Sequence, residues 1–157
     1  MKLAIVLSLV CSFGIGTVAA DDTELDKVNR VIDQLHQYAS HAQSKEYFEL
    51  FAENAVFIGT DAQEIWSKQA FQKYAQPHFS KGKGWTYTAH NRHVYFAAVG
   101  NIAWFDEMLS NASLGVTRGT GVLEKVNQQW KITQYHLTIP IPNGLADDIV
   151  KMIRQHQ

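Results

Sequence analysis

Cysteine is nearly absent from this sequence, and its scarcity limits the chemistry of the chain. The only cysteine, Cys11, lies in an N-terminal segment where Lys2 precedes an apolar run that ends in Val-Ala-Ala at 18–20. This pattern is typical of a secretory signal cleaved before Asp21. We therefore expect a periplasmic or secreted, cysteine-free chain of residues 21–157. Disulfides, thiol catalysis and cysteine-ligated metals are then excluded.

Long hydrophobic runs are missing after this segment. A membrane anchor is the alternative interpretation of the N-terminal run, and lipid attachment at Cys11 is a weaker one. The run is short, contains two glycines and is followed by acidic residues, which disfavours an anchor. We expect no membrane association after cleavage.

Basic residues are also few. Loss of Lys2 would leave 13 Lys and Arg against 15 Asp and Glu. Because phosphate binding needs a basic surface, this balance argues against nucleic acid as a partner. The sequence has no phosphate loop, nucleophile elbow or dinucleotide fingerprint, and we expect no cofactor. It has no internal repeat or linker either, which predicts one domain over residues 21–157.

The spacing of apolar residues predicts helices in the first half of the chain and strands in the second. Thr23 and Asp26 can cap an amphipathic helix that runs to about residue 44. A short strand closes at Gly59, and Ser67 can cap a second helix that ends near Pro77. Four strands and a short helix should follow, at 85–98, 101–110, 116–126, 129–140 and 145–153. This order describes an α+β fold in which an antiparallel sheet curls over helices.

Five blocks of sequence resemble the SnoaL-like branch of the nuclear transport factor 2-like superfamily. They are GTDAQEIW at 59–66, HFSKGKGW at 78–85, IAWFDE at 102–107, RGTGVLEK at 118–125 and WKITQYHLTIPIPN at 130–143. The resemblance implies a cone, in which a curved antiparallel sheet wraps N-terminal helices and leaves a cavity at the open end. The superfamily includes isomerases, polyketide cyclases, dehydratases, binding proteins and kinase association domains. It therefore implies a fold and a cavity rather than one reaction.

The last two strands form a predictable hairpin. A turn at Asn127-Gln128 places Glu124 opposite Lys131, an opposite-charge pair suited to the solvated face. The same register places Leu123 opposite Ile132 on the buried face.

Continuing this register brings polar side chains onto the buried face. Gln134 then lies opposite Gly121, and His136 lies opposite Gly119. Glycines inside a strand supply curvature or room for a neighbour. We therefore expect all four residues to line the cavity, although His136 could instead be a core histidine bonded to a carbonyl.

The strand at 101–110 offers a second candidate. Trp104 and Asp106 share one face, Phe105 and Glu107 share the other, and both faces are largely apolar. Related association domains carry a pocket-lining charge where the match places Asp106, so the resemblance favours Trp104 and Asp106 inward and Glu107 outward. Together with His136, Asp106 could do acid–base work or hold a polar ligand.

Other polar residues are weaker candidates. Asp61 and Glu64 follow the first strand near the expected cavity mouth, where a helix cap and a solvated side chain are the alternatives. Arg92 could contact a ligand or be exposed. His90 and His93 point to opposite faces of a strand, so we expect no metal site.

Three functions stay open. The chain could be an exported binding protein that holds a small, partly apolar molecule in the cone. It could be an isomerase, cyclase or dehydratase that uses Asp106 and His136, or an assembly protein with an incidental cavity. The lack of a carboxylate–tyrosine constellation favours binding. Tyr135, Leu137 and Ile139 continue the outer face as an apolar row, which predicts a homodimer through it.

Overall fold

The computed structural model describes residues 22–156, so the predicted signal peptide lies outside the described residues. The helices are α1 (Glu24–Ser40), α2 (Ser44–Glu49), α3 (Lys68–Phe79) and α4 (Ala146–Gln155), with a 3₁₀ turn η1 at Asn143–Leu145. The strands are β1 (Phe51–Ile58), β2 (Ile65–Ser67), β3 (Thr88–Phe96), β4 (Ile102–Asn111), β5 (Gly115–Val126) and β6 (Gln129–Thr138). Within residues 22–156, no helix is both long and apolar enough to span a membrane.

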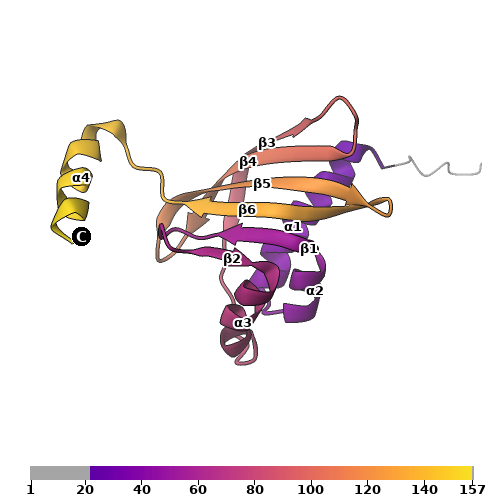
Figure 1. Ribbon diagram of the computed structural model, residues 1–157, viewed down its shortest axis with the longest axis horizontal. Coiled ribbons are helices and arrows are strands. Elements are labelled where there is room, and N and C mark those ends of the chain that lie inside the picture. Colours follow the sequence, from indigo (N-terminus) through magenta and orange to yellow (C-terminus); the bar gives the residue numbers. More distant parts are fainter. Residues whose placement is uncertain (1–21, 157) are drawn as a thin grey trace, which may run out of the picture.

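The six strands form one curved sheet in the order β2-β1-β6-β5-β4-β3 (Figure 1). All neighbours are antiparallel except β1 and β6, which run parallel. α1 packs against β3 and β6, while α3 packs against β1 and β2. The predicted α+β class and the packing of a curved sheet on N-terminal helices are confirmed, but the sheet is mixed rather than wholly antiparallel.

Local signals set the starts of the helices as predicted. Thr23 and Asp26 form a reciprocal capping box at α1, and the Ser67 hydroxyl accepts the Ala70 amide at α3. The sequence predicted that the second helix ends near Pro77, but α3 continues through it to Phe79. This residue, two positions later, is buried in the core. Core burial outweighs the one hydrogen bond that the proline cannot make.

The hairpin between β5 and β6 begins in the predicted register. Glu124 pairs with Lys131 and Leu123 with Ile132, and the turn residues Asn127 and Gln128 both have positive φ. The register then shifts by one residue, because Thr133 is an extra residue in β6 and Val122 pairs with Gln134. This β-bulge reverses the facing of every later side chain in β6.

The predicted inward orientation of Gln134 and His136 is therefore wrong. Tyr135 lies opposite Gly121 and Leu137 opposite Gly119, and these two side chains are only 4% and 8% exposed. Gln134 and His136 lie on the outer face. The predicted dimer contact through Tyr135 and Leu137 is wrong for the same reason, since both point into the molecule.

β4 also faces the opposite way from the prediction. Phe105, Glu107 and Leu109 are buried, whereas Trp104 is 44% exposed on the outer face. Asp106 is on that outer face too, where its carboxylate lies 3.2 Å from Nδ1 of His93. Burial of Phe105 and Leu109 decides the facing, and Glu107 follows them inward.

Gly119 and Gly121 face the interior, but large side chains occupy the space beside them. A Cβ on Gly121 would lie 2.6 Å from Cε1 of Phe105, and a Cβ on Gly119 would lie 2.7 Å from the Tyr135 hydroxyl. The open space expected beside His136 is therefore absent. Because Gly119 and Gly121 have no side chain, the rings of Phe105 and Tyr135 can lie against β5 at these two positions.

The C-terminal helix α4 stands apart from the cone (Figure 1). None of its residues is buried, and it leaves β6 through a connection that contains Pro140 and Pro142. Large apolar side chains remain exposed on this segment: Leu145, Val150, Met152 and Ile153. The predicted short helix is confirmed.

Candidate functional site

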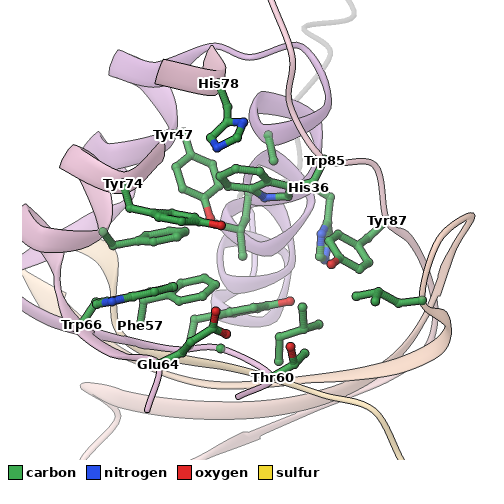
Figure 2. A pocket seen from close by; sticks show the side chains of 17 residues that line it. His36, Tyr47, Phe57, Thr60, Glu64, Trp66, Tyr74, His78, Trp85 and Tyr87 are labelled. Carbon is green, nitrogen blue, oxygen red and sulfur yellow. The ribbon is translucent and has the colours of Figure 1, made fainter. Parts of the chain in front are cut away.

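A cavity of about 240 Å³ lies between the inner face of the sheet and the helices (Figure 2). β1, β2 and the turn between them form one side, and α1, α3 and the segment before β3 form the other. The lining is mainly aromatic, with Tyr47, Phe57, Trp66, Phe71, Tyr74, Trp85, Tyr87 and Tyr135. It is thus a cone cavity, as the resemblance implied, but with different side chains from those predicted.

One wall of the cavity consists of nearly parallel rings, which we call the ring wall: Phe57, Trp66, Phe71 and Tyr74. The Phe57 and Phe71 centroids are 3.8 Å apart with planes at 15°, and Trp66 and Phe71 are 5.6 Å apart at 10°. Trp66 also stacks on Tyr74 at 4.9 Å. Because these rings stack on one another, they present ring edges and the outer faces of the stack to the cavity, and a planar molecule can stack at the end of the row.

A buried carboxylate holds a histidine at the cavity. Oε1 of Glu107, whose side chain is 0% exposed, lies 2.5 Å from Nε2 of His36. Arg92 donates from Nε to Oε2 of Glu107 at 2.8 Å and from Nη1 to Asp33 at 2.7 Å. Because a carboxylate only accepts, a neutral His36 carries its proton on Nε2 and keeps Nδ1 as an acceptor.

Arg92 does not line the cavity, but it contacts Glu107, which in turn holds the lining residue His36. Burial by itself would lower the pKa of its guanidinium, yet the charges of Glu107 and Asp33 more than offset this and raise the pKa. Arg92 is therefore charged, and it compensates the buried charge of Glu107.

Two tyrosines add hydroxyl groups to the same region. Burial, and then the nearby negative charge of Glu107, raise the pKa of Tyr135 well above its ordinary value. Burial also raises the pKa of Tyr87. Both phenols therefore stay protonated at neutral pH and can donate a hydrogen bond.

Glu64 occupies the mouth of the cavity. Its Oε2 accepts the Asp61 amide at 3.2 Å, and its carbonyl accepts the Gly59 amide at 2.8 Å. A Cβ on Gly59 would meet the Glu64 side chain where it now lies, so glycine leaves room for this carboxylate. Asp61 itself is exposed and accepts the Gln63 amide, which makes it a turn residue rather than a lining one.

The structure therefore places four of the predicted site residues outside the cavity. Trp104, Asp106, Gln134 and His136 share the outer face, where Asp106 and His136 both pair with Thr120 across the sheet. Neither can contribute to chemistry in the cavity. Within the described residues, no group of three or more His, Cys, Asp or Glu could hold a metal ion.

Sequence reasoning missed His36, Glu107 and Tyr135. His36 follows Leu35 and lies four residues after Ile32 on the apolar stripe of α1, so its helical position could have indicated an inward histidine. The facing of Glu107 had no comparable signal, because both faces of β4 are largely apolar.

Comparison with known proteins agrees with the fold. The family model for the SnoaL-like domain matches residues 28–142. No curated protein matches the chain.

Solved structures share the fold at low identity. A domain of unknown function with a cystatin-like fold from Nostoc punctiforme has a TM-score of 0.67 at 14% identity, covering 83% of this chain and 86% of that one. A candidate scytalone dehydratase from Novosphingobium aromaticivorans has a TM-score of 0.64 at 14% identity, covering 75% and 85%. A nuclear transport factor 2-like protein of unknown function from Pseudomonas putida has a TM-score of 0.62 at 13% identity, covering 74% and 86%. Because the family model covers residues 28–142, most of the sequence, the chain belongs to the SnoaL-like domain family.

Proposed function

We propose that this protein binds a small, planar and largely apolar molecule in its cavity. The observation that carries the proposal is the ring wall, whose nearly parallel rings line a cavity of about 240 Å³. Pockets for drug-sized ligands are larger, roughly 300–1,000 Å³, so the ligand is of the size of one or two fused rings.

The polar groups would then orient the ligand. Nδ1 of His36 can accept a hydrogen bond, and the hydroxyls of Tyr135 and Tyr87 can donate one. A few fixed polar groups in an otherwise apolar cavity give such a site its specificity. A ligand with a hydroxyl or carbonyl at one end fits this arrangement.

Acid–base catalysis is the second candidate function. A histidine that is oriented by a buried carboxylate can act as a general base through its free ring nitrogen, and a protonated tyrosine can stabilise a developing oxyanion. His36, Glu107 and Tyr135 supply these groups. The fold is shared with a candidate dehydratase, which is consistent with this chemistry but does not assign it.

Calorimetric titration with 2-naphthol tests the binding proposal. Trp66→Ala removes one ring of the wall, and Trp104→Ala removes an exposed ring on the outer face as a matched control. Loss of stacking and apolar contact should weaken binding by about tenfold in Trp66→Ala, equivalent to about 1.4 kcal/mol, and leave Trp104→Ala unchanged. Absence of binding to the wild type, or equal affinities in both variants, would show that the ring wall is core packing only.

A further inference from the structure

The cavity carries one fixed charge, and that charge is negative. Among the residues that line it, Glu64 is the single carboxylate, and no lysine or arginine is present. An anionic ligand would find no guanidinium or ammonium partner on this lining. A positively charged ligand would find a carboxylate.

The turn positions the backbone of Glu64, and one hydrogen bond orients its carboxylate. Its backbone closes the β1–β2 turn with Gly59, and its carboxylate accepts the Asp61 amide. Figure 2 shows this carboxylate turned into the cavity. The absence of a Cβ at Gly59 provides the room that the carboxylate occupies.

The aromatic lining adds a second feature that favours a cation. Glu64 immediately precedes β2 and Trp66 lies two residues later, both line the cavity, and Trp66 stacks with Tyr74. Tryptophan and tyrosine faces attract ammonium groups through the negative charge density of their rings. A carboxylate beside such rings is a combination that recognises amines.

We propose that the cavity selects aromatic molecules that carry an amine, with the ammonium group at Glu64 and the ring against the ring wall. This inference rests on the proposed binding function and names the class of its ligand. Glu64 confers the selectivity for charge, whereas the ring wall supplies affinity for any planar molecule. The two contributions are therefore separable by substitution.

Three naphthalene probes with different charges test the selectivity: 1-naphthylmethylamine, 1-naphthalenemethanol and 1-naphthoate. Calorimetry at neutral pH should show the amine binding about tenfold more tightly than the alcohol, a difference of about 1.4 kcal/mol, with the carboxylate weakest. Glu64→Gln should reduce the affinity for the amine to that for the alcohol and leave the alcohol unchanged. Glu49→Gln, which removes an exposed carboxylate from α2, is the matched control and should preserve the preference.

The possible failures are distinguishable. Equal binding of amine and alcohol by the wild type, or an unchanged preference in Glu64→Gln, would overturn the amine inference while the ring-wall proposal stands. If none of the three probes binds, or if Trp66→Ala leaves their affinities unchanged, the binding function itself is wrong and the inference fails with it.

Discussion

Removal of the buried carboxylate in Glu107→Ala should destabilise the protein strongly. The substitution leaves Nε2 of His36 and Nε of Arg92 without their acceptor, and each of these side chains is only 12% exposed. Breaking a buried ion pair on one side costs about 3–5 kcal/mol, because the remaining charge stays desolvated. Arg92 keeps its contact with Asp33, so we expect a loss of about 3 kcal/mol.

Urea denaturation measures this loss. A change of this size is a large part of a total stability of about 5–15 kcal/mol, and it should lower the midpoint without altering the slope of the transition. Asp106→Ala is the control, since it removes the neighbouring carboxylate on the same strand. Its contact with His93 joins two exposed groups and is worth at most about 1 kcal/mol.

The comparison of these two variants decides which carboxylate of β4 is structural. Equal losses, or a larger loss in Asp106→Ala, would mean that β4 faces the other way and that the His36 site is not held as described. The loss of stability in Glu107→Gln should lie between those of Glu107→Ala and Asp106→Ala. An amide retains one acceptor oxygen but places a donor against the other partner.

Three further predictions concern the strand packing, the acid stability and the termini. Gly121→Ala should lower stability by about 1–3 kcal/mol in a thermal melt, because its Cβ would lie 2.7 Å from a carbonyl oxygen of β6; an unchanged melt would contradict this packing. Hydrogen bonds, first that from Lys125, lower the pKa of Glu24 to about 2 from 4.5. Its stabilising effect is therefore present above pH 4.5 and lost as the pH falls toward 2, so melting temperatures of Glu24→Gln and wild type should converge there. We also propose export with cleavage before residue 21 and a homodimer that uses the exposed apolar face of α4. Intact mass would test the cleavage. Sedimentation should show a dimer for residues 21–157 and a monomer for residues 21–138, which lack α4.

Local chemistry determined the elements that the sequence could predict. The reciprocal cap of Thr23 and Asp26, the cap at Ser67 and the turn at Asn127-Gln128 act within a few residues, so their outcome does not depend on the rest of the fold. The pairing of Glu124 with Lys131 likewise follows from the turn beside it. These signals, with the family resemblance, were sufficient for the α+β cone.

The tertiary structure decided which side chains enter the cavity. A single extra residue, Thr133, shifts β6 by one position and exchanges His136 for Tyr135 on the inner face. No local signal indicates such a bulge, because it depends on which side chains of β6 the assembled fold buries. Glu107 could turn inward only because Arg92 and His36, 15 and 71 residues away in the chain, meet it there. The compensation of a buried charge is a long-range property, and it becomes visible only when the strands and α1 are assembled.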